Sequence, residues 1–216
     1  MKFDDDWKQE SVLDAYSISD DEYRFDRVET CVVVCTDIVG GARLFEELPL
    51  EDFTALLADY LGYVRAVFGQ DRIYHTLRDD IFIAFEGTSD EPLRLALDFV
   101  DKMRESALPF QCSVGISSGD VAILTHGGAA EPQGAPVAVA KGLAKIAQAR
   151  GIFIDEKTAL AVGASRITPL TVSRRVRLPH VGRSVAVQEV VGAEGALGIK
   201  ARFARAFAGV RPSLGA

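Results

Sequence analysis

Residues 31–41 read CVVVCTDIVGG. The run Cys31–Ile38 is mostly apolar and β-branched, a pattern typical of a strand that is buried on both faces. Asp37 stands near the end of this run, where a buried carboxylate is costly unless it reaches solvent, a partner or a cation. Gly40 and Gly41 follow, and glycines let a backbone approach a ligand phosphate closely. The stretch therefore predicts a central strand that delivers a carboxylate to a polar site at its end.

A second carboxylate is predicted at the tip of a hairpin. The chain from Arg72 to Phe85 reads RIYHTLRDDIFIAF, in which two short apolar strands flank the polar turn Arg78-Asp79-Asp80. Two carboxylates at neighbouring strand ends can hold Mg²⁺ when a triphosphate supplies the other oxygen ligands. Taken alone, Asp79 and Asp37 are each also typical of ordinary turn residues.

The rest of the chain alternates between helical and strand patterns. Apolar residues recur with helical periodicity over Leu50–Phe68, and a helix over Pro136–Arg150 would carry proline in its first turn, where a missing N–H costs little. Alternation with hairpins favours an α+β fold with a mixed, mainly antiparallel sheet over a doubly wound parallel sheet. The other expected elements are helices at Glu91–Ala107, Glu156–Val162 and Gly198–Ala208, strands at Phe110–Ile116, Val121–Leu124, Ile152–Ile154, Val172–Leu178 and Val185–Val191, a turn at residues 117–119 and a loop at Thr125–Gln133.

Length and composition fit one domain flanked by two charged extensions. The chain has 216 residues, of which 48% are hydrophobic, enough for a core without disulfides. Residues 1–29 are acidic, and residues 193–216 are basic and predicted helical. A net charge of -7 gives no electrostatic support for nucleic-acid binding, and no apolar run approaches the ~18 residues of a membrane span. Three cysteines without metal spacing and no signal-peptide pattern predict a cytoplasmic protein.

Four segments in order resemble the class III adenylate and guanylate cyclases. Besides the hairpin sequence above, they are VVCTDIVG from Val33, SVGISSGDV from Ser113 and QGAPVAVAKGLAKIAQARGIFID from Gln133. The family pattern is a strand with D-I-x-G, then K-x-x-G-D, a G-I-x-x-G-x-V hairpin and a G-x-x-V-N-x-A-x-R helix. The resemblance covers roughly residues 30–192. It implies a cyclase-homology fold with a ferredoxin-like core, and a homodimer, because sites of this family lie between two such domains.

The resemblance assigns metal binding to Asp37 and Asp79, with Ile38 contributing its backbone carbonyl. In the family, Mg²⁺ or Mn²⁺ ions activate the ribose 3′-hydroxyl for attack on the α-phosphate and neutralise the triphosphate. The implied ligand is therefore a nucleoside triphosphate. Possible phosphate contacts are Gly40, Gly41, Arg78, Arg177 and Arg183.

The departures from the family pattern concern the base and the transition state. The two base-selecting positions fall on His75 and Glu131, which match neither the adenine nor the guanine combination. The ribose-orienting Asn falls on Ala138 and the transition-state Arg on Gly142, and neither side chain can donate a hydrogen bond. The late phosphate-binding Lys falls near Pro179.

These losses predict a degenerate cyclase domain that binds a nucleotide or a regulatory protein partner with little or no turnover. The alternative is an active cyclase that uses other residues to make a 3′,5′-cyclic nucleotide and pyrophosphate. A purely structural dimerisation domain is a third possibility, although it would need neither aspartate.

Overall fold

The computed structural model describes residues 24–77, 80–126, 129–147, 151–178 and 181–190. They form an eight-stranded sheet in the order β2-β3-β1-β4-β6-β8-β7, with β5 paired to β4. The elements are β1 (Arg24–Ile38), α1 (Gly41–Glu47), α2 (Leu50–Phe68), the 3₁₀ turn η1 (Gln70–Arg72), β2 (Ile73–Leu77), β3 (Asp80–Glu86), α3 (Glu91–Glu105), β4 (Cys112–His126), β5 (Ala129–Gln133), α4 (Ala135–Ile146), β6 (Ile152–Asp155), α5 (Glu156–Ala161), the 3₁₀ turn η2 (Ala164–Arg166), β7 (Arg174–Arg177) and β8 (Ser184–Val190).

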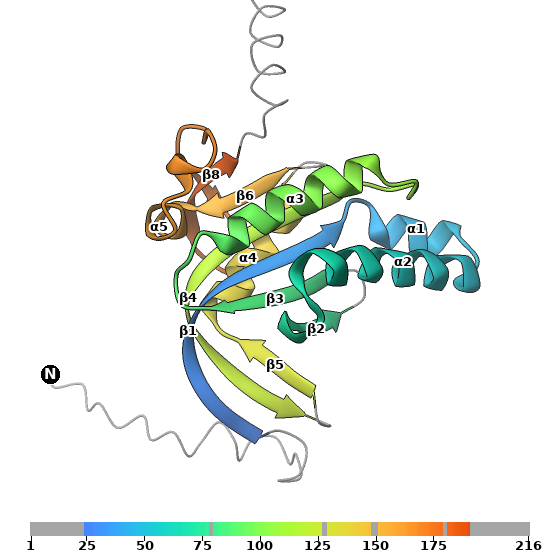
Figure 1. Ribbon diagram of the computed structural model, residues 1–216, viewed down its shortest axis with the longest axis horizontal. Coiled ribbons are helices and arrows are strands. Elements are labelled where there is room, and N and C mark those ends of the chain that lie inside the picture. Colours follow the sequence, from blue (N-terminus) through green and yellow to red (C-terminus); the bar gives the residue numbers. More distant parts are fainter. Residues whose placement is uncertain (1–23, 78–79, 127–128, 148–150, 179–180, 191–216) are drawn as a thin grey trace, which may run out of the picture.

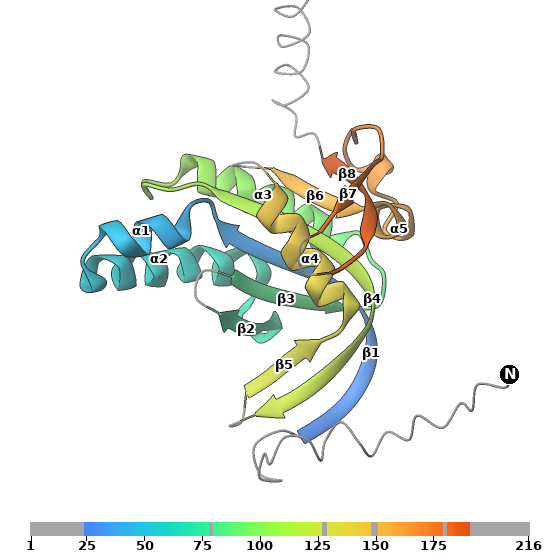
Figure 2. The same ribbon diagram turned by 180° about the vertical axis from the view of Figure 1, so that it is seen from behind.

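Helices cover both faces of the sheet. Helices α2 and α3 lie on one face and α4 on the other, as Figures 1 and 2 show from opposite sides. Because side chains alternate along a strand, β1 sends Val32 and Val34 into the core under α2 and α3. It sends Val33 and Cys35 into a smaller core under α4. Strand β1 pairs antiparallel with β3 and β4, whereas β4 and β6 are parallel, and the predicted α+β fold is confirmed.

Helix α4 is seated directly on β4 because Gly115 has no side chain. A Cβ added at Gly115 would lie 2.0 Å from the carbonyl oxygen of Ala140 and 2.5 Å from the amide nitrogen of Ala144. Next to it, the Ser113 hydroxyl donates a 2.9 Å hydrogen bond to the Ala144 carbonyl. These contacts fix the height and the rotation of α4 over the sheet, and hence the direction of its polar side chains.

The central strands are longer than predicted. Strand β1 begins at Arg24 rather than Cys31, inside the predicted acidic extension. The predicted turn at residues 117–119 is wrong, because β4 runs unbroken from Cys112 to His126 with β1 paired along it. The predicted loop Thr125–Gln133 contains β5 instead, and together β1, β4 and β5 extend away from the body of the domain (Figure 1). The predicted helix Gly198–Ala208 lies outside the described residues.

Two further features are the state of the three cysteines and the length of the helices. Cys31, Cys35 and Cys112 are all buried free thiols. Among the described residues, none of the helices combines the length and the apolar character that crossing a bilayer requires.

Candidate functional site

Two carboxylates, Asp37 and Asp80, meet at adjacent strand ends. The register of β1 and β3 pairs Thr36 with Ile81, so the next residues along the two antiparallel strands, Asp37 and Asp80, are neighbours. Both are nearly buried, with 6% of Asp37 and 4% of Asp80 exposed. Two buried carboxylates this close together require a cation, a proton or both.

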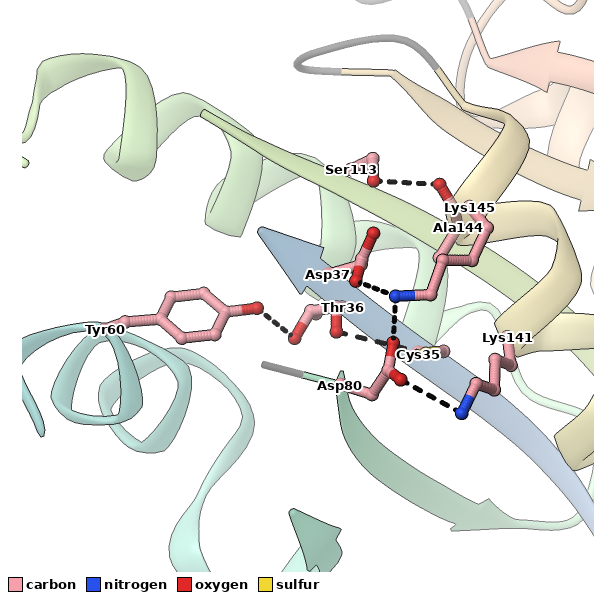
Figure 3. Close-up of polar contacts among 9 residues, drawn as sticks. All are labelled: Cys35, Thr36, Asp37, Tyr60, Asp80, Ser113, Lys141, Ala144 and Lys145. Atoms are coloured by element: carbon pink, nitrogen blue, oxygen red, sulfur yellow. Dashed lines mark hydrogen bonds and ion pairs between the residues drawn. The ribbon is translucent and has the colours of Figure 1, made fainter. Parts of the chain in front are cut away.

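The cation comes from α4. The Lys145 ammonium nitrogen lies 2.6 Å from Asp37 Oδ1 and 3.0 Å from Asp80 Oδ1. The Lys141 nitrogen lies 3.0 Å from Asp80 Oδ2. Lys141 and Lys145 are one helical turn apart and therefore point from the same face of α4, and Figure 3 shows the Lys145 nitrogen between the two carboxylates. We call Asp37, Asp80, Lys141 and Lys145 the Asp–Lys cluster; its formal charges sum to zero.

The side of the Asp–Lys cluster toward α2 is buried and contains a hydrogen bond. The Tyr60 hydroxyl donates a 2.7 Å hydrogen bond to Thr36 Oγ1, and both residues are buried (Figure 3). Thr36 directly precedes Asp37, so this contact holds the end of β1 against α2. Asp37, the next residue of β1, faces α4 and contacts Lys145 there.

Burial and ion pairing together raise the pKa of one acid and lower the pKa of the other. Burial raises the pKa of Asp37 to about 6, although the hydrogen bond from Lys145 opposes the rise. Burial also acts to raise the pKa of Asp80, but the ammonium groups of Lys145 and Lys141 outweigh it and lower that pKa. For Lys145, burial acts to lower the pKa, and the two carboxylates raise it above its ordinary value. Lys145 therefore stays charged at neutral pH.

The acid beside Asp37 is Asp80, which the sequence pattern placed in the turn. Strand β3 begins at Asp80, with Leu77 paired to it across the hairpin. Asp79, to which the resemblance assigns metal binding, and Arg78 lie outside the described residues. Among the described residues, no group of three or more His, Cys, Asp and Glu side chains could hold a metal ion. The role of Asp79 remains a prediction.

The base-selecting positions fall on neighbouring strands. His75 lies on β2, where it pairs with Phe82 of β3, and Glu131 lies on β5, where it pairs with Leu124 of β4. Strands β2 and β5 contact each other. The assignment of His75 and Glu131 as base contacts stays a prediction.

The two transition-state positions lie on α4 and face different surroundings. Ala138 is half-buried, near the start of the helix. Gly142 is buried, and a Cβ added there would lie 3.1 Å from Cδ1 and 3.2 Å from Cβ of Leu178. Leu178 is itself fully buried against Val139 and Leu143. The position to which the resemblance assigns the family's arginine therefore faces the apolar core.

The remaining predicted phosphate contacts are spread over the domain. Gly40, with φ of 79°, precedes α1, and Gly41 is its buried first residue. Arg177 is exposed on β7. Arg183 lines a cavity of about 490 Å³ with Ser117, Lys157 and the start of α4. That cavity is also lined by Pro136 and Val139 of α4 but by no member of the Asp–Lys cluster. Arg183 therefore does not share a cavity with the cluster.

Comparison with known proteins finds similarity at the level of structure. No family model matches the sequence, and no curated protein matches it. The guanylyl cyclase Cya2 aligns with a TM-score of 0.69 at 18% identity, over 78% of this chain and 95% of its own. The adenylyl cyclase CyaB from P. aeruginosa aligns with a TM-score of 0.66 at 18% identity, over 77% and 96%.

Of the three structures compared, the third has the highest sequence identity to this chain. The adenylate/guanylate cyclase/hydrolase from Silicibacter pomeroyi aligns with a TM-score of 0.61 at 23% identity, over 77% of this chain and 98% of its own. This chain has the fold of class III nucleotide cyclase domains. The similarity spans nearly the whole of each cyclase domain, and at these identities it establishes the fold of this chain but not its activity.

Sequence reasoning missed Lys145. One signal in the sequence is that Lys141 and Lys145 are the only charged residues in the α4 sequence APVAVAKGLAKI and are spaced i, i+4. Lys141 directly precedes Gly142, but one position along a helix rotates a side chain by about 100°, so it does not stand in for an arginine at Gly142. In the structure Lys141 indeed points to Asp80 while Gly142 faces Leu178.

Proposed function

We propose that this protein is a degenerate cyclase domain that binds a nucleotide or a protein partner and carries out little or no cyclisation. The observation that carries the proposal is Gly142 packed against Leu178, because even a Cβ at Gly142 would lie 3.1 Å from Leu178 and an arginine would have to displace it. The fold is that of cyclases, and the residues that perform the chemical step in the family pattern are missing.

The missing residues bear on the reaction more than on binding. Cyclisation requires the ribose 3′-oxygen to be held in line with the α-phosphate, and requires donors where negative charge develops. Ala138 and Gly142 offer no side-chain donor at the two positions in question. Losing one such donor typically costs ~10²–10³ in rate. The predicted base and phosphate contacts lie at other positions than Ala138 and Gly142. The loss of donors at these two positions is therefore compatible with nucleotide binding.

Mg²⁺ or Mn²⁺ is the cofactor that the resemblance implies, held by Asp37, the Ile38 carbonyl and Asp79. It would supply charge neutralisation for a triphosphate. Carboxylates are suitable ligands for either ion, but the Lys145 ammonium already lies between Asp37 and Asp80. The described part of this site therefore does not fit a divalent cation while Lys145 keeps this position.

An active cyclase with non-standard residues is the second candidate. It is favoured by two buried carboxylates, Asp37 and Asp80, which lie at adjacent strand ends. In that case the base and transition-state contacts would come from residues outside the family pattern. The buried thiols Cys31, Cys35 and Cys112 suit a reducing, cytoplasmic setting under either candidate.

The test separates binding from turnover. Purified protein is incubated with each of the four nucleoside triphosphates, with Mg²⁺ or Mn²⁺, while binding is measured by calorimetry and product by pyrophosphate release. We expect turnover at least ~10²-fold below the ordinary enzyme range of ~1–10³ s⁻¹. Cyclic nucleotide formed within that range, and abolished by Asp37→Ala, would establish the active-cyclase alternative.

Restoring the family residues should not restore activity. The double variant Ala138→Asn/Gly142→Arg should stay as slow as the wild type, because the arginine must displace Leu178. Gly142→Arg alone should lower the free energy of unfolding by about 1–3 kcal/mol, the usual cost of overpacking a core. Urea denaturation and the pyrophosphate assay measure the two effects, and Ala138→Asn alone is the control at the half-buried position. A large gain in turnover would contradict this account of Gly142.

A homodimer is proposed because a single domain of this fold offers half of a two-domain site. The expected interface includes residues 37–45 and 134–146, where Val39 and Phe45 are exposed apolar side chains. Sedimentation velocity at tens of micromolar, a concentration chosen for the test, should show a dimer. Phe45→Glu should shift it to monomer, whereas Leu160→Glu, at an exposed leucine of α5, should not. A wild-type protein that is monomeric throughout would contradict the proposal.

A further inference from the structure

We infer that Lys145 is a built-in counter-ion that takes the place of a divalent cation between Asp37 and Asp80, so that the folded domain neither binds nor requires a metal ion at this site. The inference goes beyond the proposed function, because it concerns which cation the two acids hold and not whether a nucleotide is bound or turned over.

The geometry of Lys145 is that of a shared cation. Its ammonium nitrogen lies 2.6 Å from Asp37 Oδ1 and 3.0 Å from Asp80 Oδ1, so one positive charge contacts both carboxylates. Asp80 Oδ1 is buried and accepts no hydrogen bond among the described residues, which makes its contact with Lys145 an ion pair without hydrogen-bond alignment. Lys145 thus serves Asp80 as a point charge, which is the role a metal ion would have.

The charge balance leaves nothing for a divalent cation to neutralise. Asp37 and Asp80 carry two negative charges, and Lys145 and Lys141 carry two positive ones, all connected within 3.0 Å. A metal ion added to this cluster would meet two ammonium groups at close range in a partly buried site. Like charges at that distance repel strongly where water is scarce.

The position of Lys145 is fixed by the packing of α4. Gly115 allows the helix backbone to touch β4, and Ser113 bonds to the Ala144 carbonyl directly before Lys145. Tethering gives the Lys145 ammonium a high effective concentration at the carboxylates, because it needs no separate binding event. A free metal ion has to compete with this tethered group.

Removal of Lys145 should create the metal site that it replaces. The Lys145→Met variant keeps a long side chain and leaves Asp37 and Asp80 with one cation fewer. We expect it to bind about one Mn²⁺ per chain, seen as loss of the free-Mn²⁺ electron paramagnetic resonance signal, and to melt at a higher temperature with Mn²⁺ than with EDTA. The wild type should show neither effect over the same Mn²⁺ range.

Two controls assign the effect to the Asp–Lys cluster. Lys102→Met removes the same kind of side chain from an exposed ion pair with Asp98 on α3 and should bind no Mn²⁺. Asp37→Asn added to Lys145→Met should abolish the new Mn²⁺ binding. Neither measurement uses a nucleotide, so their outcome is independent of whether the protein turns one over.

Two results would overturn the inference. One is a wild type that binds Mn²⁺ as tightly as Lys145→Met and loses the ion on Asp37→Asn. The other is a folded Lys145→Met that binds none. If Lys145→Met folds in neither EDTA nor Mn²⁺, the comparison passes to Asp37→Asn/Lys145→Met, which removes one charge of each sign. That double variant should fold where the single variant does not, and its failure would show that Lys145 is needed for something other than its charge.

Discussion

Replacing Gly115 by alanine should cost the protein a large part of its stability. The added methyl group would lie 2.0 Å from the Ala140 carbonyl oxygen and 2.5 Å from the Ala144 amide nitrogen. Both are backbone atoms of a helix, so no side-chain rotation relieves the overlap, and α4 has to lift off the sheet. We expect a loss of about 3 kcal/mol or more, at the upper end of overpacking costs, from a total that is typically 5–15 kcal/mol. Urea denaturation followed by circular dichroism measures it.

Gly62→Ala is the matched control for this variant. Gly62 lies inside α2, and a Cβ added there meets nothing within 4 Å. Alanine is the better helix former by up to about 1 kcal/mol, so this variant should be slightly more stable than the wild type. An unchanged denaturation midpoint for Gly115→Ala would mean that α4 does not rest on β4 as described, and the Asp–Lys cluster would then lack its support.

The sequence predicted the fold where hydrophobic patterns decide structure. The apolar run that ends in Asp37 is the central part of β1, and the helical periodicity of Leu50–Phe68 matches the bounds of α2. These elements are long and regular, so their type is set by periodicity. The turn predicted at Ser117-Ser118-Gly119 was wrong, because small polar residues suit a turn in isolation but here pair along β1.

The structure places Asp80 beside Asp37, a role that the sequence did not assign to it. The pairing of Leu77 with Asp80 makes Asp80 the first residue of β3. The resemblance assigns metal binding to Asp79, which lies outside the described residues, and that assignment stays a prediction. Hairpin register depends on the geometry of the turn, which a hydrophobic pattern does not specify.

Lys145 could not be assigned without the packing of α4. Two lysines on an apolar helix are ordinarily interpreted as its solvated face. Their actual partners come from β1 and β3, more than fifty residues earlier in the chain, and meet them because Gly115 brings the helix onto the sheet. By contrast, the glycine at the position where the resemblance expects an arginine was visible in the sequence, and the structure packs it against Leu178.

Lys145→Met should also destabilise the protein strongly, in a way that depends on pH. Removing one partner of a buried ion pair typically costs 3–5 kcal/mol, because the other charge stays buried. The side chain of Lys145 is 38% exposed, so we expect about 3 kcal/mol at pH 8 in EDTA, the lower end of that range. Lys102→Met, from an exposed pair, should cost less than about 1 kcal/mol. Urea denaturation of the three proteins provides the comparison.

The sign of the pH dependence follows from Asp37. Its pKa in the folded wild type is raised to about 6 from an ordinary 3.8, so its contribution to stability is complete below 3.8 and is lost as the pH rises through about 6. Lys145 opposes that rise in the wild type, and the variant lacks it, so the pKa of Asp37 should rise further. Lowering the pH from 8 to 5 should therefore recover more stability in Lys145→Met than in the wild type, because a proton on Asp37 replaces the lost ammonium. If the loss of stability in Lys145→Met were the same at pH 5 and pH 8, Asp37 would not depend on Lys145 for its charge.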